Sequence, residues 1–316
     1  MKRHLLIFLV LVVCSCSNRG PKPVIFDTDW WTDVDDACAV RLLLDAEREG
    51  KVGVLGICIS AVNGTSAKSL DSFLHHEGRF ELPIGADVEA LDFNGEPCYH
   101  QLIIDECNDP LARDNDGCTD CVAFYRQLLA SSKKKVDIIA VGYPNALAGL
   151  LESTPDDISR LDGRRLVERK VGHLWMMAGN YPEGKENNFC RIQRSRDAGA
   201  LVCSDWPTDI TFLGHEVGIQ VVAGGGLPED DLLHKVLAAH GSSAGRFAWD
   251  PMTTQLAISG DAVTEGFSLV RGWNRVDPES GANIFVEDPE GPHSYVVMTQ
   301  PAEWYAERIN ALLARP

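Results

Sequence analysis

The sequence predicts a single α/β domain with a mostly parallel open sheet and helices on both faces. Short apolar runs alternate with helical segments from residue 23 to the end of the chain, which is the pattern of a parallel α/β sheet. No repeat, low-complexity tract or long linker interrupts them, and a mature chain of about 300 residues suits one large domain. We therefore expect residues 21–316 to form one domain, with its sites at the carboxyl ends of the strands.

Residues 1–20 are expected to lie outside this domain. Two basic residues precede an apolar run over residues 5–13, which is too short to span a bilayer and is typical of a signal peptide. The following Val13-Cys14-Ser15-Cys16 resembles a lipobox, so Cys16 is expected to carry lipid chains that anchor the protein. We expect an exported protein, lipid-anchored to a bacterial cell-envelope membrane on its periplasmic or outer-membrane face. A plain secretory peptide is the alternative.

The chain is strongly acidic. Its formal net charge is −17, and it becomes −19 once Lys2 and Arg3 leave with the signal peptide. Such a charge argues against nucleic acids and anionic membrane surfaces as partners. The expected partner is a small molecule, membrane contact is expected through the lipid anchor only, and a homo-oligomer is compatible with the sequence.

The stretch 23–44 joins an apolar strand to an amphipathic helix, and the turn between them is crowded with acids. It holds five aspartates: Asp27, Asp29, Asp33, Asp35 and Asp36. These carboxylates would repel one another and shift one another's pKa unless a cation lay among them, and calcium or magnesium prefers such oxygen ligands. The alternative is a solvated turn in which Asp35 or Asp36 caps the helix.

Two other motifs fit this turn less well. An EF-hand loop that began at Asp27 would place Thr32 at the required glycine and Cys38 at the required glutamate. A phosphatase of the haloacid dehalogenase type also has Asp-x-Asp after a strand, but Trp31 stands where its usual threonine would be. The phosphatase stays as a minor alternative.

The remaining elements follow from apolar runs and helical periodicity. Expected strands cover residues 52–59, 82–85, 136–141, 173–178, 210–213, 285–286 and 295–298, and expected helices cover 66–77, 252–258 and 301–313. Several residues at or after the strand ends are candidate site residues, although turns and helix caps would also explain the polar ones. They are Asn63, Asn145, Met177, Glu186, Asn188, Trp249 and Asp250.

Four of the ten cysteines crowd one stretch rich in Pro, Gly and Asp. In an oxidising compartment this pattern predicts a surface excursion held by disulfides, whose pairing stays open. These cysteines are Cys98, Cys107, Cys118 and Cys121. A zinc site formed by Cys118-x-x-Cys121 and His100 is the alternative, but there is only one CxxC motif.

Together these motifs resemble the inosine-uridine-preferring nucleoside hydrolases. In that family an apolar strand runs into Asp-x-Asp-Pro-Gly-x-Asp-Asp-Ala-x-Ala, and Asp27-Thr28-Asp29 and Asp35-Asp36-Ala37-Cys38-Ala39 match its two ends. Trp30-Trp31 replaces Pro-Gly, and two further residues are inserted, as in a divergent secreted branch. The resemblance covers nearly all of residues 23–316 and implies a nucleoside hydrolase-like fold with a Rossmann-like core.

The resemblance also implies an activity and its residues. The activity is calcium-dependent cleavage of the N-glycosidic bond of a ribonucleoside or related riboside. Ca²⁺ would be held by Asp29, Asp36, Asp250 and the backbone carbonyl of Asn145, and Asp29 would also act as general base. Substrate contacts would come from Asp35, Asn63, Met177, Glu186, Asn188 and Trp249.

Trp249 is the main departure from the family pattern, because typical members carry a histidine there that aids departure of the base. An indole is no useful acid but offers a stacking face, so we expect preference for aromatic bases, with Trp30 or Trp31 as a second face. A lipid-anchored calcium- and sugar-binding protein without turnover is the alternative that Trp249 supports. The phosphatase alternative would need magnesium and a lysine in the pocket.

Overall fold

The computed structural model describes residues 20–90 and 95–314. The signal-peptide and lipobox predictions, Cys16 included, lie outside these residues. Within the described ranges, no helix has both the length and the apolar character that a membrane span requires.

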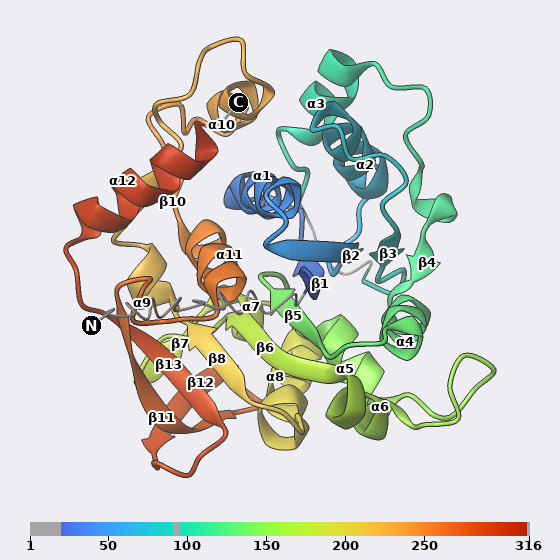
Figure 1. The fold of residues 1–316 in the computed structure, drawn as a ribbon, viewed down its shortest axis with the longest axis vertical. Coiled ribbons are helices and arrows are strands. Elements are labelled where there is room, and N and C mark those ends of the chain that lie inside the picture. Colours follow the sequence, from blue (N-terminus) through green and yellow to red (C-terminus); the bar gives the residue numbers. More distant parts are fainter. Residues whose placement is uncertain (1–19, 91–94, 315–316) are drawn as a thin grey trace, which may run out of the picture.

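One large sheet runs through the molecule, and Figure 1 shows it between two layers of helices. Eleven of the described strands form this sheet, in the order β4-β3-β2-β1-β5-β6-β8-β13-β11-β12-β7. Neighbours are parallel from β4 to β13: β4 (Thr119–Asp120), β3 (Ile84–Ala86), β2 (Val52–Ile59), β1 (Lys22–Thr28), β5 (Val136–Ala140), β6 (Val171–Met177), β8 (Ile210–Leu213) and β13 (His293–Met298). The last three are antiparallel: β11 (Phe267–Val276), β12 (Ala282–Glu287) and β7 (Glu183–Lys185). A separate pair joins β9 (Val222–Ala223) to β10 (Arg246–Phe247). The predicted single-domain, mostly parallel α/β fold is confirmed.

Helices cover both faces of this sheet. On one face lie α1 (Asp35–Arg48), α2 (Ser66–His76), α3 (His100–Cys107), α10 (Leu232–Ala239), α11 (Trp249–Ser259) and α12 (Ala302–Leu313). On the other lie α4 (Cys121–Ser131), α5 (Asn145–Glu152), α6 (Gly163–Lys170) and α8 (Gln193–Asp205). The short α7 (Asn187–Cys190) and α9 (His215–Gly218) follow β7 and β8.

The two cores explain why the central strands are apolar throughout. In β1, Val24 and Phe26 pack into the core under α1 and α11, whereas Ile25 packs into the core under α4 and α5. Alternate side chains of a strand point to opposite faces, and both faces here are covered, so neither needs polar residues.

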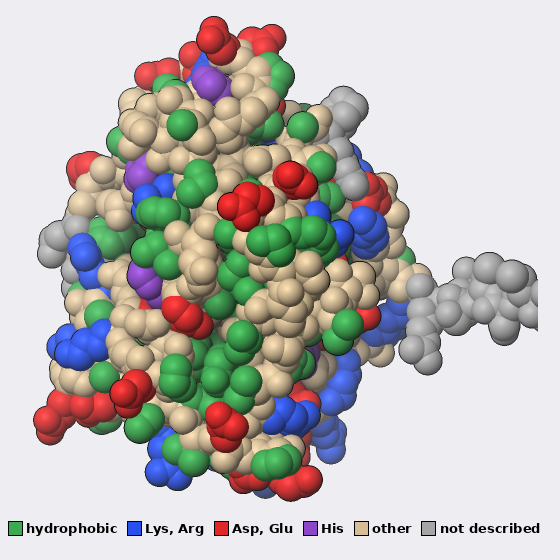
Figure 2. All heavy atoms as spheres, turned by 90° about the vertical axis from the view of Figure 1, so that its left-hand side faces the viewer, with side chains coloured by type: hydrophobic (Ala, Val, Ile, Leu, Met, Phe, Trp, Pro, Cys, Tyr) green, Lys and Arg blue, Asp and Glu red, His purple; other side chains and the backbone are tan. Residues whose placement is uncertain are grey.

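The outer side of the antiparallel strands is more exposed. Figure 2 shows the side of the molecule where α12 and β11 to β13 lie, and hydrophobic side chains gather on it. Leu269, Trp273, Ile284 and Val286 belong to these strands and are between 42% and 49% exposed. In the sequence, these strands therefore mix polar with apolar residues and do not appear as apolar runs.

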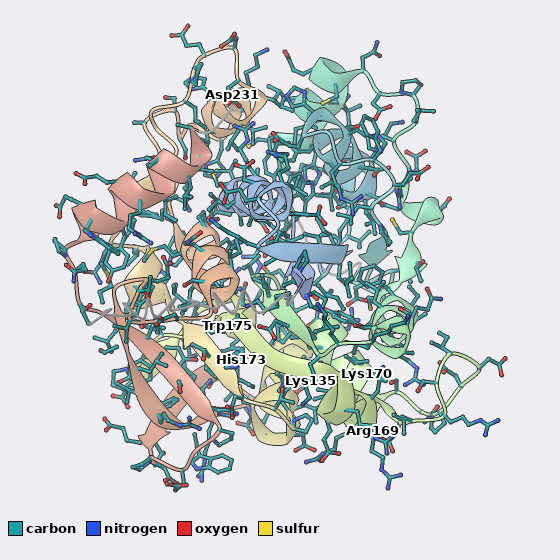
Figure 3. All side chains as sticks on the ribbon, viewed as in Figure 1. Lys135, Arg169, Lys170, His173, Trp175 and Asp231 are labelled. Carbon is teal, nitrogen blue, oxygen red and sulfur yellow. The ribbon has the colours of Figure 1, made fainter. Side chains whose placement is uncertain are left out.

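Basic side chains gather at the amino ends of the parallel strands, where the described chain enters the sheet. Lys22 begins β1, and the Nζ of Lys134 contacts the carbonyl of Gly20 at 3.1 Å. Lys135 and Lys170 immediately precede β5 and β6, and Figure 3 shows them near one another, with Arg169 beside Lys170. The acidic turn lies at the other end of these strands, after the carboxyl end of β1.

The disulfide prediction is wrong for the described structure, in which Cys98, Cys107, Cys118 and Cys121 are free thiols. Cys118 packs against the core under α1 and α2, whereas Cys121 is buried in the core on the opposite face. Their sulfurs therefore point to different sides of the sheet. The same separation removes the zinc alternative, since His100 instead contacts Thr65 and the carbonyl of Trp30.

Candidate active site

The acidic turn follows β1 and closes onto the start of α1. The hydroxyl of Thr28 donates to the carboxylate of Asp36, and the backbone N–H of Trp30 lies 3.2 Å from the same carboxylate oxygen. Gly142, after β5, lies against this turn, because a Cβ there would be 2.4 Å from the backbone nitrogen of Asp29. Only glycine allows so close an approach, so the end of β5 helps to hold the turn in place.

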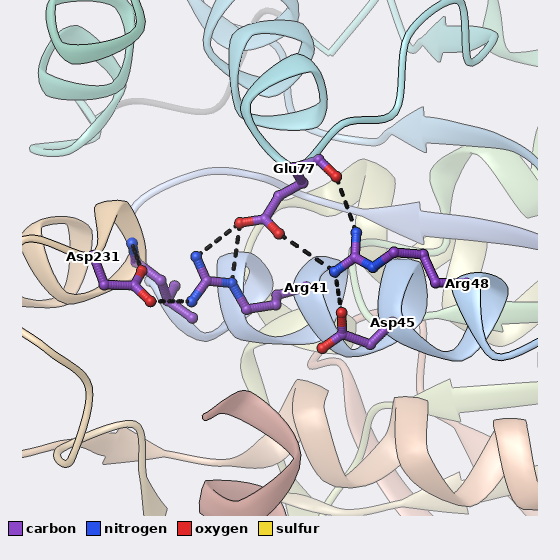
Figure 4. A network of polar contacts seen from close by, with 6 residues as sticks. Arg41, Asp45, Arg48, Glu77 and Asp231 are labelled. Atoms are coloured by element: carbon purple, nitrogen blue, oxygen red, sulfur yellow. Dashed lines mark hydrogen bonds and ion pairs between the residues drawn. The ribbon is translucent and has the colours of Figure 1, made fainter. Parts of the chain in front are cut away.

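Helix α1 is fixed by a network of ion pairs (Figure 4). The guanidinium of buried Arg41 bonds to Glu77 and to Asp231, each at 2.7 Å, which joins α1 to α2 and to the start of α10. Arg48, about two helical turns further along, contacts Asp45 and Glu77. The first turn of α1, which carries Asp35 and Asp36, is therefore held by contacts along the rest of the helix.

Three buried carboxylates converge between α1 and α11. Asp35, Asp36 and Asp250 each offer one oxygen, and these oxygens lie within 4.8 Å of one another. The backbone N–H of Asp250 donates to Asp35 at 3.1 Å, which couples the two helix starts. Calcium binds oxygens at about 2.4 Å, so oxygens on opposite sides of the ion lie about 4.8 Å apart. The donor set and its spacing therefore suit a hard divalent cation such as calcium.

The electrostatics of the cluster point the same way. Burial, followed by repulsion from neighbouring carboxylates, raises the pKa of Asp29, Asp35 and Asp250 well above the usual range. Burial also raises the pKa of Asp36, to about 6. Among the described residues, none of these four carboxylates forms an ion pair with a basic side chain. A bound cation would remove the cost of burying them ionised.

Asp33 differs because it has a cationic partner. Its carboxylate bonds to the guanidinium of Arg246 at 2.6 and 2.8 Å. Burial opposes ionisation of Asp33, but the bonds to Arg246 outweigh it and lower the pKa. This pair lies beside the cluster and leaves its three converging oxygens unneutralised.

A cavity of about 240 Å³ opens over the cluster. Eight residues predicted from the sequence line it: Asp29, Asp35, Asp36, Met177, Glu186, Asn188, Trp249 and Asp250. Four others that sequence reasoning did not place there also line it: Asp33, Val141, Asn187 and His215. The structure thus brings together residues at or after the ends of β1, β5, β6, β7 and β8 with the start of α11.

Glu186 and Asn188 add polar groups to the lining of the same cavity. Glu186 is 6% exposed and accepts hydrogen bonds from the backbone N–H groups of Gly179 and Asn188, yet burial raises its pKa to about 7. The amide nitrogen of Asn188 donates to the carbonyls of Val141 and Met177 at 3.0 and 2.9 Å. Asn188 therefore ties the ends of β5 and β6 together at the cavity.

Two predicted residues lie outside the cavity lining. The side-chain oxygen of Asn63 accepts from the backbone and hydroxyl of Thr65, as in an ordinary polar turn. The side chain of Asn145 is buried without a hydrogen-bond partner among the described residues and lines a different pocket, with Arg194. The sugar contact of Asn63 and the calcium contact of the Asn145 carbonyl stay predictions.

The expectation that Trp30 or Trp31 offers a stacking face is wrong. Trp30 has a φ of 42° and is fully buried, with its indole N–H donating to Ser69 and its ring packed against Phe73. Trp31 is also buried, and its N–H donates to the carbonyl of Gly95. Both rings serve the core around the turn, and neither lines the cavity.

Trp249 and His215 form the apolar end of the cavity. Their rings stack with centroids 5.4 Å apart, and the indole N–H of Trp249 donates to the backbone carbonyl of His215 at 2.9 Å. Gly218 makes this packing feasible, since a Cβ there would lie 2.1 Å from the indole ring. A lone histidine after a strand has no distinctive spacing, so the sequence offered no signal for His215.

Aspartate 27 is not part of the cavity. Its carboxylate accepts a hydrogen bond of 2.6 Å from the hydroxyl of Tyr125 in α4. Complete burial raises its pKa to about 7. The first aspartate of the motif is thus a buried structural acid that links β1 to α4.

Comparison with known proteins identifies the fold. No family model and no curated protein matches this sequence. A plant nucleoside hydrolase, the PpNRh1 enzyme, is similar in structure, with a TM-score of 0.71, 19% identity and coverage of 94% of this chain and 100% of that one. The inosine-uridine preferring nucleoside hydrolase of Bacillus anthracis has a TM-score of 0.67, 15% identity and coverage of 92% and 99%. The type III effector protein XopQ, solved with adenosine diphosphate ribose, has a TM-score of 0.65, 14% identity and coverage of 93% of each chain. At these identities the comparisons establish a shared fold.

Proposed function

We propose that the protein hydrolyses the N-glycosidic bond of a riboside, with Ca²⁺ held by the carboxylates of the cavity. The convergence of Asp35, Asp36 and Asp250 carries this proposal, because their spacing and burial suit a calcium ion. The shared fold supports it, since two of the similar structures are nucleoside hydrolases. The ADP-ribose complex of XopQ supports a ribose-containing ligand.

The chain's own residues account for the chemistry that such a reaction needs. When bound, Ca²⁺ supplies a fixed positive charge that orients water and sugar hydroxyls and favours loss of a proton from water. Asp29 lines the same cavity, where its carboxylate can accept that proton as a general base. The ring gains positive charge in an oxocarbenium-like transition state, which the acidic cavity wall stabilises. Glu186 supplies a carboxylate that can accept from the sugar hydroxyls.

Binding without turnover is the second candidate function, and Trp249 is the observation that favours it. Its indole N–H is engaged with a backbone carbonyl and cannot protonate a leaving base. The phosphatase alternative has less support, because no lysine is among the described residues that line the cavity. We also propose, from the lipobox alone, that the protein is exported and lipid-anchored through Cys16.

Release of sugar from a panel of ribosides, with and without a calcium chelator, tests the proposal. We expect free ribose from at least one nucleoside, loss of that activity with chelator, and recovery when calcium is added in excess. Binding of nucleosides without release of sugar would support the second candidate. Release of phosphate from sugar phosphates with magnesium, and no release of sugar from ribosides, would favour the phosphatase.

A further inference from the structure

We propose that His215 is the proton donor to the departing base, an assignment that rests on the proposed riboside hydrolysis. Its imidazole lines the cavity at the end formed with Trp249. The donor would thus come from α9, after β8, instead of from the start of α11.

No other side-chain N–H group among the described residues of the cavity wall can serve as an acid near neutral pH. The indole N–H of Trp249 donates to the carbonyl of His215, and both amide hydrogens of Asn188 face backbone carbonyls. The amide of Asn187 donates to the hydroxyl of Tyr143 at 2.9 Å. In contrast, the ring nitrogens of His215 make no hydrogen bond to any described residue. His215 is therefore the lining side chain with an imidazole N–H available to a ligand.

The backbone around His215 holds the imidazole in position. Its own N–H donates to the carbonyl of Gly179 at 2.8 Å, and its carbonyl accepts the indole N–H of Trp249. Stacking on that indole fixes the ring plane from one side. The neighbouring carboxylate of Glu216 is held by a hydrogen bond of 2.9 Å from the backbone N–H of Tyr181.

This arrangement separates two tasks at the base end of the site. Trp249 offers a stacking face, and His215 offers the proton. As the bond between C1′ and the base nitrogen breaks, its electron pair stays on the base, and a nitrogen of the base takes the proton of the His215 imidazolium. The oxygen of water bonds to C1′, and the proton that this water loses passes to Asp29. Net transfer of one proton from Asp29 to His215 through solvent restores both groups, so one water is consumed for each riboside.

Two substrates with different leaving groups test the assignment in the full-length protein. Inosine has a base that leaves poorly without a proton, whereas p-nitrophenyl β-D-ribofuranoside releases a stable phenolate. General acids contribute roughly 10²–10⁴-fold, so His215→Ala should lower kcat on inosine by about that factor and change the p-nitrophenyl riboside only slightly. His215→Gln keeps a hydrogen-bond donor but has no transferable proton, so its kcat on inosine should fall as far as that of His215→Ala. His76→Ala, at an exposed position on α2, is the matched control.

Each other outcome overturns a distinct part of the reasoning. Equal losses on both substrates, or no loss on inosine, would show that His215 is not the proton donor. Full inosine activity in His215→Gln would make it a positioning residue that only hydrogen-bonds the base. If the parent cleaves the p-nitrophenyl riboside but not inosine, the proposed riboside hydrolysis stands, but the assignment of His215 as proton donor is refuted. Cleavage of neither riboside by a calcium-loaded, folded parent would refute the proposed function itself.

Discussion

Replacing Glu186 by Gln should make the stability of the protein less sensitive to pH. The carboxyl group is almost fully buried, and burial raises its pKa from 4.5 to about 7. When a carboxyl group has a higher pKa in the folded state than in the unfolded one, the folded state holds its proton more tightly. Below pH 4.5 the buried carboxyl group is protonated and does not lower the free energy of unfolding. As the pH rises from 4.5 through 7, its ionisation lowers that free energy.

The size of this effect follows from the two pKa values. They differ by about 2.5, and each pKa unit corresponds to 1.36 kcal/mol, so ionisation of Glu186 should cost the folded protein about 3 kcal/mol at pH 8. We expect the free energy of unfolding of Glu186→Gln, relative to the parent, to rise by about that amount between pH 4 and pH 8. Hydrogen bonds that Gln makes less well than Glu affect both pH values alike and cancel in this comparison.

Urea denaturation at both pH values, in the presence of a calcium chelator, measures the difference. Glu183→Gln, at an exposed position in β7, is the control and should show no such change. The reasoning fails if the parent and Glu186→Gln differ by the same free energy at pH 4 and pH 8. That result would mean that the Glu186 carboxylate is ionised in the folded protein at little cost.

Four further predictions concern the metal, the turn, the base and the anchor. Millimolar calcium should raise the melting temperature of the parent but not of Asp36→Asn, which should also be inactive; an unchanged parent melting curve would contradict the calcium site. Gly142→Ala should reduce riboside hydrolysis severely, because the new Cβ would lie 2.3 Å from the Ser60 hydroxyl and displace the turn that holds Asp29; wild-type kinetics would show that the turn tolerates the shift. Trp249→Ala should slow hydrolysis of purine nucleosides far more than that of ribosyl fluoride, and equal losses would make the ring a simple wall. Cys16→Ser should abolish incorporation of labelled palmitate, and equal labelling of mutant and parent would point to another anchor.

Much of the fold could be predicted because the central strands are buried on both faces. The apolar runs at β1, β2, β5 and β6 stand out for that reason. Strand β11 was not expected, since Arg271 and Asn274 interrupt its apolar residues and one side of it faces solvent. Its pairing with β12 and β13 is a tertiary effect that periodicity over a single strand does not capture.

Some residues of the candidate site could be predicted from the sequence, and others could not. A crowded group of buried aspartates needs a cation or protons to neutralise it, so Asp35, Asp36 and Asp250 could be predicted as candidate metal ligands from chemistry and motif. The position of a single aromatic ring depends on the helices around it. Trp30 therefore turned into the core beside α2 and α3, and His215, which no motif marks, reached the cavity.

The amino ends of the parallel strands lie on the side of the sheet away from the cavity. This placement bears on how the cavity would be oriented relative to a membrane. Lys22 begins β1, and the acidic turn follows its last residue, about 20 Å away for a strand of seven residues. If Cys16 carries the lipid, Lys134, Lys135 and Lys170 stand on the side of the bilayer headgroups, and the mouth of the cavity faces the aqueous compartment. Ribosides would then be captured from solution rather than from the membrane, and both products would be released on the side away from the lipid.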